Sequence, residues 1–178
     1  NNLTYKDIAA IMAREAGAYS GDTVARRPFQ QSVWVYSCVT LTAQSFSQIP
    51  IWLGRESTST KGRKKGFQQI FSHPILDLLE QPNPVMTRET FFEAWITYLL
   101  TGGNVWIYID APNTMGIPRS LMVMGVGQVR PNRDPNTGRL VSWLVRTGQG
   151  REQEVGLEDM IHTRLLTPYD SIMGLPPI

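Results

Sequence analysis

The order of the expected elements predicts an α+β fold, with N-terminal helices packed on a mostly antiparallel sheet. Up to Leu100, apolar side chains recur at helical spacing; after Gly103, short runs of β-branched and aromatic residues alternate with turn formers. Helices followed by strands are typical of α+β proteins, because a parallel sheet needs regular alternation of the two. The length of 178 residues suits one domain with a core. We expect an arm and linker over residues 1–30 and one α+β domain over residues 31–178.

The first expected element is a short amphipathic helix over residues 3–16. Thr4 and Asp7 have the spacing of a capping box, and Gly17 follows the last helical position. Residues 18–30 hold turn formers without a period, so we expect a mobile connection that lets the helix dock on a neighbouring subunit. The residues at helical spacing are Ile8, Ile11, Met12 and Glu15.

The next segments predict a long helix, a strand and a hairpin. Residues 31–48 keep an apolar flank at helical spacing despite several β-branched residues. Pro50 ends that helix, and the short apolar run over residues 49–54 predicts a strand. The polar, basic stretch over residues 55–67 is typical of an exposed hairpin tip. On the helix we expect Val35, Val39, Thr42 and Phe46 on one face, with Trp34, Cys38, Leu41 and Ser45 beside it.

Two more helices are expected before the strands begin. Pro74 suits the first position of a short helix, which must end by about Gln81 because the prolines of residues 82–84 cannot continue it. Thr87 is the expected N-cap of the next helix, whose wide apolar face predicts a buried, central position. One glycine of residues 102–103 supplies the left-handed conformation that ends it. The two apolar ridges are Phe91, Trp95 and Leu99, and Phe92, Ile96 and Leu100.

The rest of the chain predicts strands joined by short turns. DPNTG, residues 134–138, and TGQG, residues 147–150, are expected hairpin connectors. The glycine pair in MGVGQV, residues 124–129, lacks the third glycine and the helix of a dinucleotide site, so a bend between strands explains it better.

Composition excludes several classes of protein. Cys38 is the only cysteine, so neither an intrachain disulfide nor a cysteine-based zinc site can form, and a reducing compartment fits best. A net charge of +2 is too small to indicate a nucleic-acid binder from bulk charge alone. No apolar run has the roughly 20 residues that span a bilayer, and the N-terminus lacks a signal pattern. We expect a soluble, cytoplasmic protein.

The residues do not predict a catalytic, cofactor or metal site. Gly102 and Gly103 end a helix, whereas a phosphate cradle needs the free N–H groups of a helix N-terminus. His73 is expected to cap a helix or to pack beside it, and His162 to be a satisfied strand residue, without a second ligand at metal spacing. We therefore expect no catalytic residues, no cofactors and no metal. The candidates for contact with a DNA backbone are Arg63, Lys64 and Lys65, although a solvated hairpin tip is the favoured explanation of this cluster.

Residues 32–178 contain a series of short motifs whose order and spacing are informative. The PNP turn, Pro82, Asn83 and Pro84, and the helix end at Gly102, Gly103 and Asn104 are the most diagnostic of them. The pieces are VWVYSCVT, QIPIWL, SHPILDLLEQPNPVMT, TFFEAWITYLLTGGNVWIYI, LMVMGVGQVRPN, MIHTRL and DSIMGLPPI. In this order and spacing the chain resembles the portal protein family of tailed, double-stranded DNA bacteriophages, in the long-tailed branch.

The resemblance implies a structural subunit of a ring, usually of twelve copies, at one vertex of a capsid. Such a ring forms part of the conduit for DNA packaging and ejection and joins the head to the tail, without enzymatic activity or cofactors. The implied partners are other copies of the chain, capsid and scaffold proteins, the terminase motor, tail adaptor proteins and non-specifically bound double-stranded DNA, with no membrane. The implied location is the virion, after assembly in the bacterial host cytoplasm.

The chain departs from the family at Ile178, where portal proteins continue into the helices of the stem and clip. We therefore expect the N-terminal part of a portal subunit, comprising much of its outer wing. Two alternatives stay open. One is a non-viral α+β domain that binds a peptide at a sheet edge. The other is an α+β enzyme in which the strand ends bring Asp110, His162 and Asp170 together.

Overall fold

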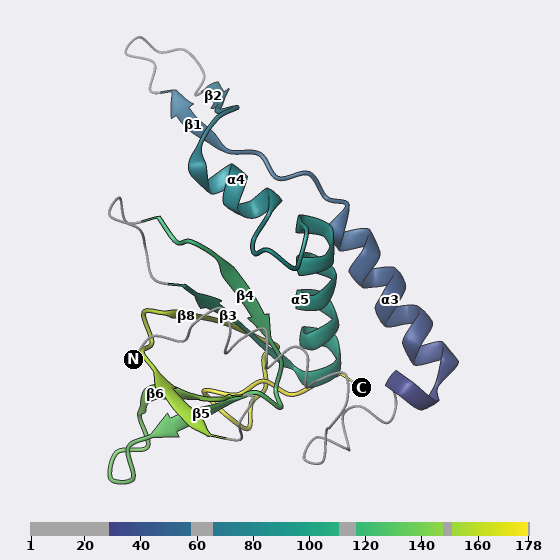
Figure 1. The fold of residues 1–178 in the computed structure, drawn as a ribbon. Coiled ribbons are helices and arrows are strands. Elements are labelled where there is room, and N and C mark those ends of the chain that lie inside the picture. The colour runs from purple at the N-terminus through teal and green to yellow at the C-terminus, as the bar shows by residue number, and fades with distance from the viewer. Residues whose placement is uncertain (1–28, 58–65, 111–116, 148–150, 178) are drawn as a thin grey trace.

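The computed structural model describes residues 29–57, 66–110, 117–147 and 151–177 of the chain. Within these residues, helices dominate the first part and antiparallel strands the second, as Figure 1 shows, so the predicted α+β class is confirmed. The expected arm over residues 3–16 lies outside the described residues. The elements are α3 (Val33–Ser47), β1 (Gly54–Ser57), β2 (Gly66–Gln69), α4 (Pro74–Glu80), α5 (Arg88–Gly102), β3 (Asn104–Ile109), β4 (Leu121–Met124), β5 (Val129–Arg133), β6 (Leu140–Arg146), β7 (Glu152–Val155) and β8 (Met160–Arg164).

Helix α3 forms where the spacing predicts it. Ser32 is its N-cap, and the Ser32 hydroxyl oxygen accepts a hydrogen bond from the N–H of Val35 at 3.4 Å. The buried positions of the helix recur every fourth residue, at Val39, Ala43 and Ser47, and α3 packs against α5. Of the residues that were expected to share one face, Val39 is buried, Val35 and Phe46 are half-buried and Thr42 is exposed.

Strands β1 and β2 form an antiparallel hairpin in which Gly54 lies opposite Gln69. The predicted strand over residues 49–54 is wrong in position, because regular pairing begins only at Gly54 and residues 50–53 have no regular structure. Pro50 has no N–H to donate to a strand partner, which disfavours a ladder there. Of the expected hairpin tip over residues 55–67, the ends form part of β1 and β2, and residues 58–65 lie outside the described residues. Figure 1 shows the hairpin and α4 projecting from the end of the molecule opposite β5 and β6.

Helix α4 begins with Pro74 at its first turn and ends at Glu80, close to the predicted bounds. His73 is its N-cap, and the Nδ1 of His73 accepts a hydrogen bond from the N–H of Ile75 at 3.2 Å. Its apolar stripe is only partly covered, since Leu78 is buried while Ile75 is exposed. The expected capping role of His73 is confirmed.

Helix α5 lies between α3 and the strands β3 and β4 (Figure 1). Of its residues, Phe91 and Phe92 are buried and the remaining apolar positions are half-buried. The helix therefore has the expected central position, although most of its apolar side chains keep some contact with solvent. Thr87 is the N-cap residue as predicted, although its side chain makes no hydrogen bond to the backbone there.

The strands form two three-stranded antiparallel sheets, with orders β4-β3-β8 and β5-β6-β7. In the first sheet Trp106 lies opposite both Met124 and His162. In the second sheet Trp143 lies opposite both Pro131 and Val155. The predicted DPNTG connector joins β5 to β6.

Strand β3 is the centre of the fold, because both of its faces are buried. One face packs against α5, and the other faces the second sheet, so alternate residues enter two different cores. Burying a large apolar side chain contributes roughly 1.5–3 kcal/mol, which makes these two clusters the main source of stability. The first cluster is Phe91, Phe92, Val105, Ile107 and Val123. The second cluster is Trp106, Tyr108, Met122, Met124, Val129, Trp143, Val145, Val155 and Met160.

Candidate functional site

Two short turns fasten α5 to the first sheet, one at each end of the helix. The proline turn, Pro82–Pro84, precedes α5, and the glycine joint, Gly102–Asn104, follows it. The proline turn bonds to Leu121, which lies opposite the last residue of β3, whereas the glycine joint contains the first residue of β3. The motif residues that the sequence singled out therefore form two separate contacts, at opposite ends of the β3–β4 pair.

The proline turn is organised by the buried side chain of Asn83. Its amide oxygen accepts hydrogen bonds from the N–H groups of Val85, at 3.0 Å, and Met86, at 2.9 Å. Its amide nitrogen donates to the carbonyl of Leu121 at 2.9 Å, and the N–H of Leu121 donates to the carbonyl of Pro82 at 2.7 Å. One side chain thus shapes the turn and also fastens it to the start of β4.

The glycine joint is organised by Asn104, which is 2% exposed. The amide nitrogen of Asn104 donates to the carbonyls of Gly102, at 3.1 Å, and Gly174, at 2.8 Å. Its amide oxygen accepts from the N–H of Gly174 at 2.6 Å and lies 3.1 Å from the Nε2 of His162. Because that oxygen is an acceptor, His162 must carry its proton on Nε2. The side chain of Asn104 therefore connects α5, β8 and the C-terminal segment, which is the part of the chain after β8, residues 165–177.

The backbones at the glycine joint approach too closely for side chains. Gly103 has a φ of 70°, the left-handed conformation, and donates its N–H to the carbonyl of Leu99 at 2.9 Å. A β-carbon on Gly103 would overlap the carbonyl carbon of Leu175, and one on Gly174 would overlap the carbonyl oxygen of Gly103. That same carbonyl accepts a hydrogen bond from the N–H of Leu165 at 2.9 Å. The geometry requires glycine at both positions.

His162 is held between aromatic rings beside the joint. Its ring stacks on Trp106, with centroids 4.7 Å apart and planes 4° apart, and meets the edge of Trp143 at 4.8 Å. Burial, followed by the positive charge of Arg164, lowers the pKa of His162 to about 4. His162 is therefore neutral near pH 7, as expected of a satisfied strand residue.

Asp170 fastens the C-terminal segment to the second sheet. Its carboxylate accepts hydrogen bonds from the N–H groups of Ile172, at 2.7 Å, and Met173, at 3.1 Å, and from the guanidinium of Arg133 at 2.8 Å. The Ile172 hydrogen bond, and then Arg133, lower the pKa of Asp170 to about 2. This contact was not predicted from the sequence, in which the turn-forming Asp-Ser at residues 170–171 is the local pattern that points to it.

The residues of the enzyme alternative are not gathered into one site. His162 lies opposite Trp106, whereas Asp110 follows the far end of β3, about 13 Å away along the strand. The carboxylate of Asp170 is already bonded to Arg133 and two backbone amides. In the described part of the chain, no group of three or more His, Cys, Asp and Glu residues is placed to hold a metal ion.

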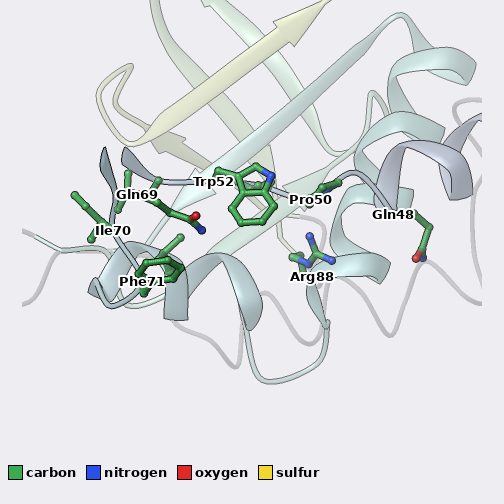
Figure 2. Close-up of a pocket in the computed structure, with 10 residues that line it drawn as sticks. Gln48, Pro50, Trp52, Gln69, Ile70, Phe71 and Arg88 are labelled. Carbon is green, nitrogen blue, oxygen red and sulfur yellow. The ribbon is translucent and has the colours of Figure 1, made fainter. Parts of the chain in front are cut away.

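An open pocket of about 250 Å³ lies between the segment before β1, the end of β2 and the start of α5. Figure 2 shows Trp52 and Arg88 at this pocket, with Phe71 near the other end. The Arg88 guanidinium donates to the carbonyl of Ile49 at 3.4 Å and to Glu89 at 3.3 Å. The pocket therefore combines an apolar wall with one charged group. Its lining consists of Gln48, Pro50, Ile51, Trp52, Leu53, Gln69, Ile70, Phe71, Leu76 and Arg88.

Exposed large apolar side chains are grouped at several places outside the cores. Three of these groups lie on α3, around the pocket and along the segment after β8. Arg63, Lys64 and Lys65, the candidates for contact with DNA, lie outside the described residues. In the ranges that the structure describes, each helix is too short or too polar to cross a bilayer. The exposed residues at the three places are Val33, Trp34, Tyr36 and Leu41; Ile51, Trp52, Phe71 and Ile75; and Leu166, Tyr169 and Leu175.

Comparison with known proteins identifies a family. Residues 33–178 match the family model described as phage portal protein. An uncharacterised protein of Rickettsia bellii (strain RML369-C) is 35% identical over 79 residues, which are 44% of this chain and 18% of that protein.

Solved structures with a similar fold come from gene transfer agent (GTA) particles. The neck of an empty GTA particle computed with C6 symmetry contains a chain that is 27% identical, with a TM-score of 0.71 over 97% of this chain and 45% of that one. The virion of a native GTA particle gives 24% identity and a TM-score of 0.68, over 96% of this chain and 44% of its match. The neck of a native GTA particle computed with C12 symmetry gives 24% identity and a TM-score of 0.67, over 94% and 43%. The chain thus spans less than half the length of the chains that it matches.

Proposed function

Because the chain belongs to the phage portal protein family, we propose that it is a structural subunit of a portal ring at one vertex of a capsid. The observation that carries the proposal is the family match over residues 33–178, which includes both turns that fasten α5. In this role the chain forms part of the conduit for DNA packaging and ejection and of the connection between head and tail. The proposed role is structural and involves neither catalysis nor a cofactor.

A ring of twelve copies is the proposed assembly. A chain of similar fold occurs in a particle neck computed with C12 symmetry, which supports this number. A closed ring needs head-to-tail contacts, so each subunit must present two different surfaces that meet around the circle. The exposed apolar side chains on α3, at the pocket and after β8 supply surfaces suited to such contacts.

The proline turn and the glycine joint make the subunit stiff, because they hold α5 on the sheet. Asn83 and Asn104 hold the two ends of α5 on the sheet, and Asp170 holds the C-terminal segment on β5. A ring element under load must transmit force without its helices sliding, which close packing and buried hydrogen bonds resist. The geometry therefore suits a subunit that transmits force without deforming.

DNA in a conduit must slide, so contacts with it should be few and directed at the backbone. Arg63, Lys64 and Lys65 are the proposed contacts, by counterion release rather than base reading. We expect weak, salt-sensitive and sequence-independent DNA binding. Tight, sequence-specific binding in a shift assay at physiological salt would contradict the portal role.

The other proposed partners follow from the position at the vertex. They are capsid and scaffold proteins, the terminase motor and tail adaptor proteins, and assembly takes place in the cytoplasm of the bacterial host before the ring becomes part of the virion. The pocket beside Trp52 and Arg88 is a surface that one of these proteins could contact, because it combines apolar area with a guanidinium.

Electron microscopy tests the proposal most directly. We expect rings with a central hole when the full-length gene product is imaged, together with a mass of about twelve subunits by light scattering. Compact monomers of the full-length product would overturn the ring. A monomer that binds extended peptides at a sheet edge would instead favour the protein-interaction alternative.

A further inference from the structure

Helix α3 carries an exposed face without charge, which we call the α3 stripe. It consists of Trp34, Cys38, Leu41 and Ser45, spaced so that they lie on one side of the helix. Trp34 is 83% exposed and Leu41 is 68% exposed. The solvent side of a helix normally carries charged residues, yet α3 contains none over its whole length. The stripe has the composition of an interface.

The hydroxyl groups on and beside this face already have partners within the helix. The hydroxyl of Ser45 donates to the carbonyl of Leu41 at 2.7 Å, and the hydroxyl of Thr42 donates to the carbonyl of Cys38 at 2.7 Å. Covering the face would therefore leave no unpaired hydroxyl proton, so the desolvation cost of burying these hydroxyl groups is small. The small side chains of Cys38 and Ser45 beside the large Trp34 and Leu41 also provide the grooves and ridges that a second helix needs.

The α3 stripe lies on the outermost layer of the fold. Figure 1 shows α3 on the side of α5 that faces away from the sheets, so its outer side is open for a partner. The buried residues of the helix, Val39, Ala43 and Ser47, occupy the opposite side. A partner can therefore cover the stripe without disturbing the contact between α3 and α5.

The sequence itself contains a segment of complementary chemistry. Residues 3–16 predict an amphipathic helix with Ile8, Ile11 and Met12 on one face. Residues 17–28 connect this segment to the start of the described structure and span about 40 Å when extended, nearly twice the length of about 22 Å of α3. A helix that folds back on its neighbour in sequence usually needs a connection of only about 2–8 residues.

We propose that the α3 stripe is the docking surface for residues 3–16 of a neighbouring copy of this chain. The apolar face of the arm covers Trp34 and Leu41, and the long connection carries it from one subunit to the next. The contact is head-to-tail, because the arm of one copy meets the stripe of another, so it can repeat around a closed ring. The proposal rests on the proposed function, since it assumes that neighbouring copies assemble.

Cys38 makes the proposal directly testable, because the chain has no other cysteine and Cys38 is exposed in the α3 stripe. The arm receives one new cysteine at a time, as Ile8→Cys, Ile11→Cys or Met12→Cys. The matched control is Ala10→Cys, which lies on the opposite face of the expected helix. Helices packed face to face bring some pairs of Cα atoms within the roughly 7 Å that a disulfide allows. After mild oxidation, non-reducing gels separate linked chains, and light scattering of unoxidised samples gives the oligomeric state.

We expect at least one apolar-face cysteine to form an intermolecular disulfide, seen as dimers and a ladder of larger species, several-fold above the Ala10→Cys control. Oligomers in which no apolar-face cysteine exceeds the control would overturn the docking proposal and leave the ring intact. A disulfide within one chain, in a monomer, would mean that the arm packs on its own α3 and would count against both proposals. Monomers without preferential linkage would also count against both.

A substitution in the stripe provides an independent measurement. Leu41→Lys places a charge in the proposed contact and should weaken association at least about tenfold, since burying a leucine contributes more than about 1.4 kcal/mol. Leu41 is exposed in the single subunit, so the free energy of unfolding should change little. Val141→Lys is the control, because Val141 is exposed on β6, away from α3. Equal effects of the two substitutions on association would contradict the assigned surface.

Discussion

The carbonyl carbon of Leu175 occupies the space that a β-carbon on Gly103 would need. Gly103 also has a φ of 70°, and its carbonyl accepts a hydrogen bond from Leu165. Conformation and close approach thus require glycine at the same residue. This contact fastens the end of α5 to the segment after β8, and its two requirements can be separated by experiment.

We expect Gly103→Ala to lower the free energy of unfolding by about 2–4 kcal/mol, from the left-handed conformation and the overlap with Leu175 together. Gly138→Ala is the matched control, because Gly138 has a φ of 67° but nothing within 4 Å of a β-carbon. That variant should lose only about 1–2 kcal/mol. Urea unfolding followed by tryptophan fluorescence measures both, and equal losses would show that the close approach carries no energy.

Asn104→Ala removes hydrogen bonds to Gly102, Gly174 and His162 and leaves buried groups without partners. We expect a loss of about 2–4 kcal/mol in the free energy of unfolding. Asn136→Ala is the control, because Asn136 is exposed in the β5–β6 turn and takes part there through its backbone N–H. Hydrogen exchange at the Gly174 amide should also become faster in Asn104→Ala, and unchanged exchange would argue against the assigned contact.

The lowered pKa of His162 predicts a specific dependence of stability on pH. Below about pH 6.5 the unfolded chain binds a proton that the folded chain, with a pKa of about 4, does not bind. Stability should therefore fall as the pH decreases from about 6.5 to about 4, by on the order of 1–2 kcal/mol once solvent screening is allowed for. The pKa of Asp170 is lowered to about 2, so its contribution is lost only at still lower pH. Urea midpoints at pH 7, 6 and 5 should fall in the wild-type chain and much less in His162→Leu.

The two roles of Asn83 can be separated by two substitutions. Asn83→Asp keeps an oxygen that accepts from Val85 and Met86 but loses the donor to Leu121, whereas Asn83→Ala loses all of these hydrogen bonds. We expect both variants to be less stable than the wild type, each by about 1–3 kcal/mol. Hydrogen exchange at the amides of Val85 and Met86 should become faster only in Asn83→Ala. Faster exchange at these amides in both variants would mean that the turn depends on its contact with β4.

Local patterns in the sequence were enough to predict several elements. The spacing of apolar residues predicts α3, Pro74 predicts the start of α4, and the glycines after α5 predict its end, because each depends on neighbours within a few positions. The position of β1 was missed, because a strand depends on a partner as well as on its own residues. The pairing of β3 with β8 in one sheet, while β5, β6 and β7 form another, depends likewise on residues far apart in the chain.

The hydrogen bonds that hold the two ends of α5 could not be predicted from the sequence either. Asn104 and Asn83 were singled out as motif residues, but the sequence did not indicate that their side chains reach Gly174 and Leu121. Such contacts join residues far apart in the chain, for which a single sequence gives no spacing rule. The exposure of Trp34 could not be predicted either, since a helical pattern identifies the faces of a helix but does not say which face packs against the rest of the fold.

The contact between Asn104 and Gly174 joins residues 70 positions apart, and this separation sets an order of events during folding. Helix α5 and strand β3 are adjacent in sequence and can pair early, whereas closing the longer loop costs more chain entropy. While the chain emerges from the ribosome, β3 must wait for β8 with one edge unpaired, which is a route to aggregation. We expect pulse-labelling hydrogen exchange to find the Tyr108 amide, which lies on the β4 side of β3, protected before that of Gly174, so that the C-terminal segment closes the fold last.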